Sequence, residues 1–359
     1  MHLRAELGAV PAYVPGRSEE QVAAAYGLDR VVKLASNEAA HGPLPGVLAE
    51  ATRRAALTHR YPDSQNTELR AALGRRYGVD ADRIVAGNGS VALCQQLVAA
   101  TSGPGDEVLF AWRSFEAYPV FPALAGATGV RVPLTADHRH DLRAMAAAVT
   151  ARTRLIFVCS PNNPTGTAST AAEVEGLLAR APRDVTVVLD EAYREYGDDP
   201  DAFDGLEVAG RHPNVAVLRT FSKAYGLASL RVGWCVAPPE LADALRRTAV
   251  PFAVNAVAQQ AALVSLEHGD EVASRALAVI GERKRVTDEI RALGLQIPSS
   301  QGNFVWLPVG ATARPLAVEL ERRGVITRPY GDDGVRVTIG LPEENDLFLA
   351  ALPLALAAL

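Results

Sequence analysis

The sequence has few lysines and no long apolar run. Only three of its 36 basic residues are lysine, namely Lys33, Lys223 and Lys284, and the others are arginine. Any chemistry that needs a lysine amine is therefore restricted to three positions. No apolar run reaches the roughly 18 residues that a membrane-spanning helix requires, so we expect no membrane as a partner.

Cysteine is also scarce, and no basic cluster is present. Cys94, Cys159 and Cys235 lie far apart in apolar surroundings, so we interpret them as buried thiols and exclude a disulfide framework. The formal net charge is −5, which argues against nucleic acid as a partner. The first six residues lack the charged and apolar regions of a signal peptide. We therefore expect a cytoplasmic protein.

Short apolar segments alternate with helical segments between residues 83 and 237. Several are continuously apolar and β-branched, as in strands that helices cover on both faces. The predicted strands are 83–86, 107–111, 130–132, 155–159, 185–189, 215–218 and 232–236. This alternation predicts an α/β fold with a mainly parallel, seven-stranded sheet and helices on both faces. The connection before the last strand is too short for a crossover helix, so we expect that strand to be antiparallel.

The rest of the chain has a different pattern, which predicts a smaller α+β domain. A helical stretch, 254–293, precedes three strand-like segments and a closing helix from Glu343. The strand-like segments are 303–307, 325–327 and 335–339. The division that we predict is an N-terminal segment, 1–45, joining the small domain, a large domain, 46–250, and a small C-terminal domain, 251–359.

Segment 87–92 follows the first predicted strand and opens an apolar helix. Its sequence, Gly-Asn-Gly-Ser-Val-Ala, fits the pattern G-x-G-x-x-A. Glycines let the backbone approach a phosphate, and the N–H groups and dipole of a helix N-terminus stabilise the anion. A dinucleotide site also needs an acidic residue after the second strand, but Asp106 and Glu107 precede that strand. The motif therefore favours phosphate binding over NAD, and a plain tight turn is the alternative.

Three further polar groups follow predicted strands. Asn162 lies in a rigid loop of prolines and glycine, Asp190 ends a strand, and Lys223 follows the next strand. Ligands of open α/β sheets bind at the carboxyl ends of the strands. Small residues flank Lys223, whereas Lys284 lies on a charged helix face. Lys33 lies between two apolar residues, and none of the candidate catalytic residues is near it in the sequence. If a lysine of this chain forms an imine, it is Lys223.

A phosphate cradle, an amide, a carboxylate and a lysine are together the groups that pyridoxal phosphate chemistry requires. The amine forms an imine with the cofactor aldehyde, and the carboxylate keeps the ring nitrogen protonated. Asn162 and Tyr193 suit the phenolic oxygen of the ring. Arg231 and Ser222 complete the phosphate site. The alternative for Asp190 is a structural role, in which its carboxylate caps the start of a helix.

These motifs resemble those of the fold-type I pyridoxal phosphate-dependent aminotransferases. Within that fold type the chain resembles the histidinol-phosphate aminotransferase group and, within the group, bacterial aromatic amino acid (phenylalanine) aminotransferases. The resemblance covers nearly the whole length. The segments that carry it are 13–16, 34–38, 60–63, 112–115, 161–166, 190–193, 222–228 with Arg231, 250–252, 303–306 and 328–331.

The resemblance implies a role for each site residue. The expected catalytic residues are Lys223, which would hold the cofactor covalently, Asp190 and Tyr193. The residues expected to bind pyridoxal 5′-phosphate are Gly89, Ser90, Val91, Phe115, Asn162, Asp190, Tyr193, Ser222, Lys223 and Arg231. Tyr61 is expected to reach the phosphate of the neighbouring subunit in a homodimer with shared active sites. The residues expected to contact the substrate are Arg336, Asn37 and Tyr13. The alternative for Phe115 is a purely structural role as an aromatic residue of the core. The alternative for Arg336 is an exposed arginine on a strand, without contact to a substrate.

The resemblance further implies the reaction. We expect amino transfer between an aromatic L-amino acid and 2-oxoglutarate by a ping-pong mechanism. Arginines suit the phosphate of histidinol phosphate equally well, so histidinol-phosphate aminotransferase is the alternative. More distant are a threonine-phosphate decarboxylase-like enzyme and a non-catalytic ligand-binding module. We expect no metal site, because the loop His138-Arg139-His140 has no carboxylate neighbours suited to a metal and is interpreted as solvated.

Overall fold

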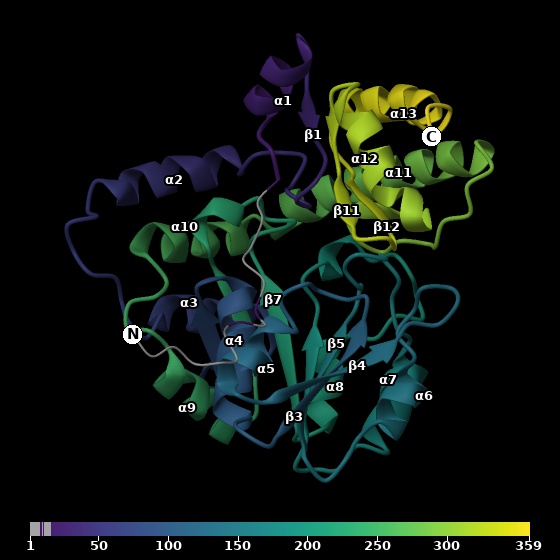
Figure 1. Cartoon of the computed structure of the whole chain (residues 1–359). Helices are drawn as coiled ribbons and strands as arrows, with labels where there is room; N and C mark the ends of the chain where they lie inside the picture. The colour runs from purple at the N-terminus through teal and green to yellow at the C-terminus, as the bar shows by residue number, and fades with distance from the viewer. Residues whose placement is uncertain (1–7, 9, 11–15) are drawn as a thin grey trace.

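The computed structural model describes residues 8, 10 and 16–359. Tyr13, an expected substrate contact, lies outside the described residues. A large sheet with helices on both faces forms the lower part of the molecule in Figure 1, and two smaller sheets with further helices lie above it.

The large sheet has seven strands in the order β2-β8-β7-β6-β5-β3-β4. Their bounds are β2 Ile84–Gly87, β3 Glu107–Trp112, β4 Thr128–Pro133, β5 Thr153–Cys159, β6 Thr186–Asp190, β7 Val215–Thr220 and β8 Gly233–Val236. β8 pairs antiparallel with both β2 and β7, and the other neighbours are parallel. The predicted fold class, including the antiparallel last strand, is confirmed.

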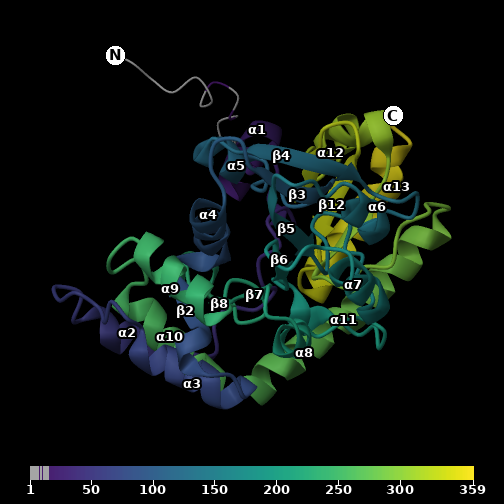
Figure 2. The same ribbon diagram turned by 90° about the horizontal axis from the view of Figure 1, so that it is seen from below.

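The large sheet lies between layers of helices (Figures 1 and 2). Apolar side chains at alternate strand positions face opposite layers. Leu155 and Phe157 of β5 pack toward one layer, whereas Ile156 and Val158 pack toward the other. The first layer comprises α4 (Gly89–Thr101), α5 (Val120–Ala125) and α9 (Pro239–Thr248). The second comprises α6 (Leu142–Ala147), α7 (Ala171–Leu178) and α8 (Gly205–Arg211). Double coverage explains why these strands are continuously apolar.

A third group of helices packs beside β2 and β8 at the edge of the sheet. It comprises α2 (Pro45–Ala55), α3 (Thr67–Tyr77) and α10 (Ala256–Glu267). The predicted helical stretch 254–293 is two helices, because α10 ends and α11 (Gly269–Ala292) begins at His268. A Cβ on Gly269 would lie 2.3 Å from an Arg76 nitrogen. The start of α11 therefore lies against the guanidinium of Arg76 on α3.

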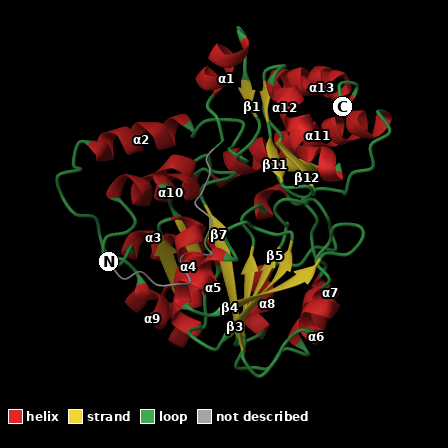
Figure 3. Cartoon of the chain, viewed as in Figure 1, coloured by secondary structure: helices red, strands yellow, loops and turns green. Residues whose placement is uncertain are grey.

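The smaller sheets contain the remaining strands (Figure 3). β9 (Phe304–Leu307), β11 (Arg328–Tyr330) and β12 (Gly334–Thr338) form an antiparallel sheet. β1 (Val32–Lys33) pairs in parallel with β10 (Val325–Ile326), which ties the N-terminal part of the chain to its C-terminal part. The remaining helices are α1 (Glu19–Tyr26), α12 (Ala313–Glu321) and α13 (Pro342–Leu356).

β11 was not predicted because Pro329 interrupts a short polar segment. The division into 1–45, 46–250 and 251–359 stays a prediction. The three cysteines are buried and free, as predicted. Within residues 8, 10 and 16–359, no helix combines the length and the apolar character needed to cross a bilayer.

Candidate active site

Two glycines bring backbone and guanidinium groups together at the N-terminus of α4. Gly89 has φ +76°, and a Cβ there would lie 2.2 Å from an Arg231 nitrogen. A Cβ on Gly233 would lie 2.5 Å from the backbone nitrogen of Ser90. Only glycine fits at either position, so the start of β8 presses Arg231 against the start of α4. The first N–H groups of α4 receive no side-chain cap, which leaves them available to an anion.

Arg231 itself has a left-handed backbone, with φ +59°. Strain of this kind costs about 1 kcal/mol or more and is common at functional sites. Its Nη1 donates to Ser222 Oγ at 3.1 Å and to the Ala228 carbonyl at 2.9 Å. The structure thus brings Gly89, Ser90, Ser222 and Arg231 together. Val91 follows them in the first turn of α4 and is partly exposed.

Lys223 lies just beyond the carboxyl end of β7. Its Nζ donates to the carbonyl oxygens of Ser36 at 3.2 Å and Asn37 at 3.0 Å, and it lies 5.6 Å from the centre of the Tyr193 ring. Burial, with a further contribution from the charge of Arg336, lowers the pKa of the Lys223 amine to about 7. Much of this amine is therefore neutral near pH 7, and the neutral form is the nucleophile and base.

Asp190 ends β6 and is only 3% exposed. Tyr118 Oη donates to its Oδ2 at 2.7 Å, but Oδ1 is buried without a partner. Burial raises the pKa of the Asp190 carboxyl to about 6, although the bonds from Tyr118 and from the Ala192 N–H oppose the shift. An uncompensated buried carboxylate is costly unless a cation faces it. The site therefore has a place for a cationic group at Oδ1.

Asn37 and Tyr193 connect the lysine to the small sheet. The amide of Asn37 donates to Tyr193 Oη at 3.1 Å, and its backbone N–H donates to Thr338 Oγ1 at 2.9 Å. The backbone of Asn37 is left-handed, with φ +52°, which asparagine tolerates better than most residues. Burial raises the pKa of the Tyr193 phenol well above its usual value. Tyr193 is therefore a neutral donor near the amine.

The amide of Asn162 is fully engaged within the protein. Its Oδ1 accepts from Ser114 Oγ at 2.7 Å and faces His140 Nε2 at 3.0 Å. Its Nδ2 donates to the Arg113 carbonyl at 3.1 Å and to Thr165 Oγ1 at 2.8 Å. A side-chain amide has two donors and two acceptor positions, so none remains for a ligand.

Asn163, the next residue, contacts side chains of β11 and β12 in the small antiparallel sheet. Its Oδ1 accepts from Arg336 Nη1 and, at 3.3 Å, from Tyr330 Oη. No hydrogen bond from its Nδ2 occurs in the described part of the chain. Asn163 therefore has a free amide donor beside Arg336, whereas Asn162 does not.

Arg336 is 6% exposed and is held from three sides. Its Nη1 also donates to Tyr330 Oη at 2.7 Å, and its Nη2 donates to the Ala35 carbonyl at 2.6 Å. Its Nε has no partner. The Nε–H and one N–H of Nη2 remain for two parallel hydrogen bonds to a carboxylate. Arg336 is not the exposed strand arginine of the alternative interpretation.

Phe115 and Tyr61 lie in different surroundings. Phe115 is half-buried and packs edge to face on Tyr118, with ring centres 5.5 Å apart, so it lies near Asp190. Tyr61 is 82% exposed and stacks on Phe252 at 4.5 Å. The described contacts of Tyr61 include none of the other predicted site residues of this chain.

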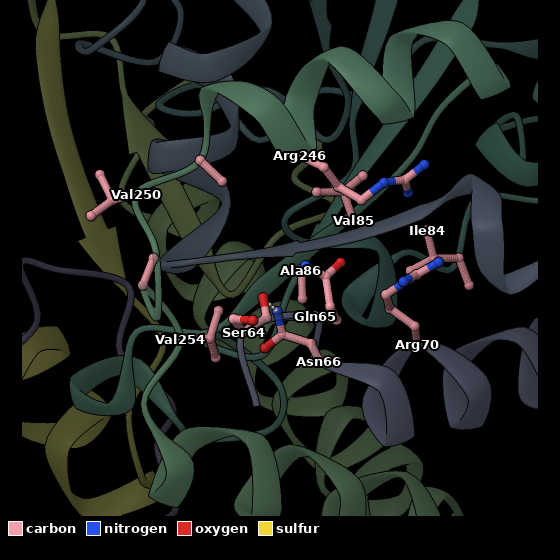
Figure 4. A pocket seen from close by; sticks show the side chains of 12 residues that line it. Ser64, Gln65, Asn66, Arg70, Ile84, Val85, Ala86, Arg246, Val250 and Val254 are labelled. Carbon is pink, nitrogen blue, oxygen red and sulfur yellow. Dashed lines mark hydrogen bonds between the residues drawn. The ribbon is translucent and has the colours of Figure 1, made fainter. Parts of the chain in front are cut away.

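A small cavity lies apart from this cluster (Figure 4). Its volume is about 50 Å³, and its lining comes from the start of α3, from β2 and from the segment after α9. None of the predicted site residues lines it. It is far smaller than the roughly 300 Å³ or more of a ligand pocket.

Three residues of the cluster were missed by sequence reasoning, and one prediction was wrong. Tyr118 carries no signal other than its ring, Tyr330 lies in segment 328–331 but was given no role, and Asn163 is indistinguishable from Asn162 by type. His140 was interpreted as solvated, but it is 5% exposed and contacts Asn162, because the loop folds inward against the sheet. Among the described residues, no group of three or more histidine, cysteine or acidic side chains is arranged to hold a metal.

Comparisons with known proteins point to one family. The model of the aminotransferase class I and II family matches residues 29–352. An aromatic amino acid aminotransferase from Rhodococcus jostii is 56% identical over 97% of this chain and 94% of its own length. One from Streptomyces coelicolor is 54% identical over 97% and 95%. Among solved structures, histidinol-phosphate aminotransferase from Sinorhizobium meliloti, in complex with pyridoxal 5′-phosphate, is 28% identical, with a TM-score of 0.90 over 99% of this chain and 98% of that chain.

Proposed function

The chain belongs to the aminotransferase class I and II family, and we propose that it transfers the amino group between an aromatic L-amino acid and 2-oxoglutarate with pyridoxal 5′-phosphate as cofactor. The observation that carries the choice of substrate is the name shared by relatives that are 54–56% identical over 97% of the chain. The histidinol-phosphate enzyme is similar in fold at half that identity, so it supports the alternative less strongly.

The hydrogen-bonding groups of the cluster that have no partner within the protein fit this cofactor. The uncapped start of α4, Ser222 and Arg231 would hold its phosphate. The unpartnered Oδ1 of Asp190 would face its ring nitrogen, and Phe115 would lie against the ring. Asn163 and Tyr193 would donate to its phenolic oxygen. We assign this amide role to Asn163, in place of Asn162, because only Asn163 has a free N–H group.

When bound, pyridoxal 5′-phosphate supplies an aldehyde that reacts with amines and a ring that withdraws electrons from the substrate α-carbon. The protein supplies the rest. Lys223 Nζ would hold the cofactor at rest and would take the proton from the substrate α-carbon during the reaction. Its lowered pKa, about 7, suits a base that must both accept and release a proton near neutral pH.

Arg336 would bind the α-carboxylate of the substrate. We expect Arg336→Lys to raise KM for phenylalanine by about 50-fold, because lysine cannot make the two parallel hydrogen bonds that a guanidinium makes. The absorbance of the bound cofactor should not change. Steady-state kinetics and a visible spectrum test this, with Arg314→Lys on the exposed surface of α12 as the control. An unchanged KM would remove Arg336 from the substrate site.

A homodimer with shared active sites is part of the proposal. Tyr61, Phe252 and Val250 expose 82%, 41% and 71% of their surface, and the two rings stack together. An apolar group of this kind suits a subunit interface. Tyr61 would then reach the cofactor phosphate held by the partner.

The substrate is tested by steady-state rates of the cofactor-loaded protein with phenylalanine, tyrosine and histidinol phosphate, each against 2-oxoglutarate. We expect kcat/KM for the aromatic amino acids to exceed that for histidinol phosphate by about tenfold or more, a difference of about 1.4 kcal/mol in transition-state binding. Dominant activity with histidinol phosphate would contradict the proposal in favour of the alternative.

A further inference from the structure

His140 is buried in the loop between β4 and α6, and it contacts the loop that carries Asn163. Its Nε2 lies 3.0 Å from Asn162 Oδ1. Both N–H groups of Asn162 already donate elsewhere, so its oxygen is the atom that faces the ring. An oxygen can only accept, and His140 must therefore carry its proton on Nε2 and leave Nδ1 bare. Nδ1 is buried without a partner.

The ring is neutral in this position. Burial, with a smaller contribution from the charge of Arg139, lowers the pKa of His140 to about 4, although the bond to Asn162 and the charge of Glu173 oppose the shift. Because Nε2 carries the only N–H group of the neutral ring, the hydrogen bond to Asn162 Oδ1 fixes the orientation of the ring.

Asn162 joins three loops at the carboxyl edge of the sheet. Ser114 and the Arg113 carbonyl lie in the loop that carries Phe115, and Thr165 lies in its own loop. His140 comes from the third loop, after β4. The backbone of the Asn162 loop is closed by bonds from the Asn162 N–H to the Thr167 carbonyl, 2.8 Å, and from the Gly166 N–H to the Asn162 carbonyl, 2.7 Å. The neighbouring residue in this loop holds Arg336.

We propose that His140 is a positioning residue of the cofactor site: by donating its Nε2–H to Asn162, it fixes the two loops that present Phe115 and Asn163. The inference rests on the proposed function. His140 touches neither substrate nor cofactor and acts through Asn162. The bare Nδ1 is the cost of this arrangement, because a ring that is buried only for packing gains nothing from an unpaired nitrogen.

Three variants separate positioning from packing. His140→Leu removes the donor, whereas His140→Gln keeps an amide N–H with a similar reach. Met145→Ala, at a buried position of α6, is the control for a loss of stability without loss of the hydrogen bond. The measurement is the dissociation constant of pyridoxal 5′-phosphate from each cofactor-free protein, together with KM and kcat for phenylalanine.

We expect His140→Leu to weaken cofactor binding about fivefold, the equivalent of one hydrogen bond, and to raise KM for phenylalanine by a similar factor. His140→Gln should stay within about twofold of the parent protein, and Met145→Ala should bind the cofactor normally. Normal binding by His140→Leu, or equal impairment of His140→Gln, would overturn the inference and leave the proposed function intact. A parent protein that binds no cofactor would overturn both.

A measurement on the parent protein covers the case in which His140→Leu fails to fold. In ¹⁵N NMR spectra of histidine-labelled protein, the signals absent from His140→Gln belong to His140. We expect these signals to report an Nε2–H tautomer that does not titrate between about pH 5 and pH 8. An Nδ1–H tautomer, or titration within that range, would overturn the inference.

Discussion

Replacing Lys223 with alanine is expected to reduce transamination by about 10⁴-fold or more and to remove the visible absorbance of the cofactor-loaded protein. The amine lies beyond the end of β7, beside Tyr193 and the carbonyl oxygens of Ser36 and Asn37. No other lysine is placed to substitute for it, because Lys33 pairs with Glu38 and Lys284 is exposed on α11.

Lys284→Ala is the control for this result. It removes an amine of the same kind from an exposed helix position, and we expect both turnover and absorbance to stay at the level of the parent protein. Full turnover by Lys223→Ala would defeat the assignment of the catalytic amine, and with it the interpretation of the whole cluster.

Replacing Asp190 with asparagine is expected to change activity and stability in opposite directions. The pKa of this carboxyl is raised from 3.8 to about 6 in the cofactor-free protein. A raised pKa means that the folded state holds the proton more tightly than the unfolded state. The stability that this group contributes is therefore complete below about pH 4 and is lost as pH rises through about 6. Asparagine carries no charge at any pH, so the variant does not lose this stability as the pH rises.

We expect cofactor-free Asp190→Asn to be more stable than the parent by about 2 kcal/mol at pH 8, and by about half as much at pH 5, because pH 5 lies between the two pKa values. The amide cannot hold the ring nitrogen protonated, so kcat should fall by about 10³-fold. Urea unfolding at the two pH values and steady-state kinetics test both effects. Asp184→Asn, at an exposed position before β6, is the control. A variant that is destabilised at pH 8 or retains full activity would contradict the assigned role.

Much of the fold follows from the sequence because its signals are local. The β-branched runs that become β5, β6 and β7 are buried on both faces, and a strand covered by helices on both sides needs no polar alternation. The short link between Leu218 and Val232 excludes a crossover helix, which predicts the antiparallel β8. The split of the expected helix at His268 was missed because a single glycine inside a helical pattern is compatible with a continuous helix.

The candidate site was predictable where residue type alone carries the signal. Lys223 is identifiable because lysine is so rare in this chain, and the glycines of segment 87–92 mark the start of α4. Asn162 and Asn163 share one motif, and only tertiary packing decides which amide stays free. His140 follows Arg139 in a polar segment, so its sequence context indicates solvent, yet the loop turns its ring inward.

The central claim is that Lys223 is the amine that holds pyridoxal 5′-phosphate. Borohydride reduction of the cofactor-loaded protein, followed by proteolysis and mass spectrometry, identifies the lysine to which the cofactor is fixed. We predict a single modified peptide, which contains Lys223. Modification at Lys33 or Lys284 instead, or no modified peptide at all, would contradict the account.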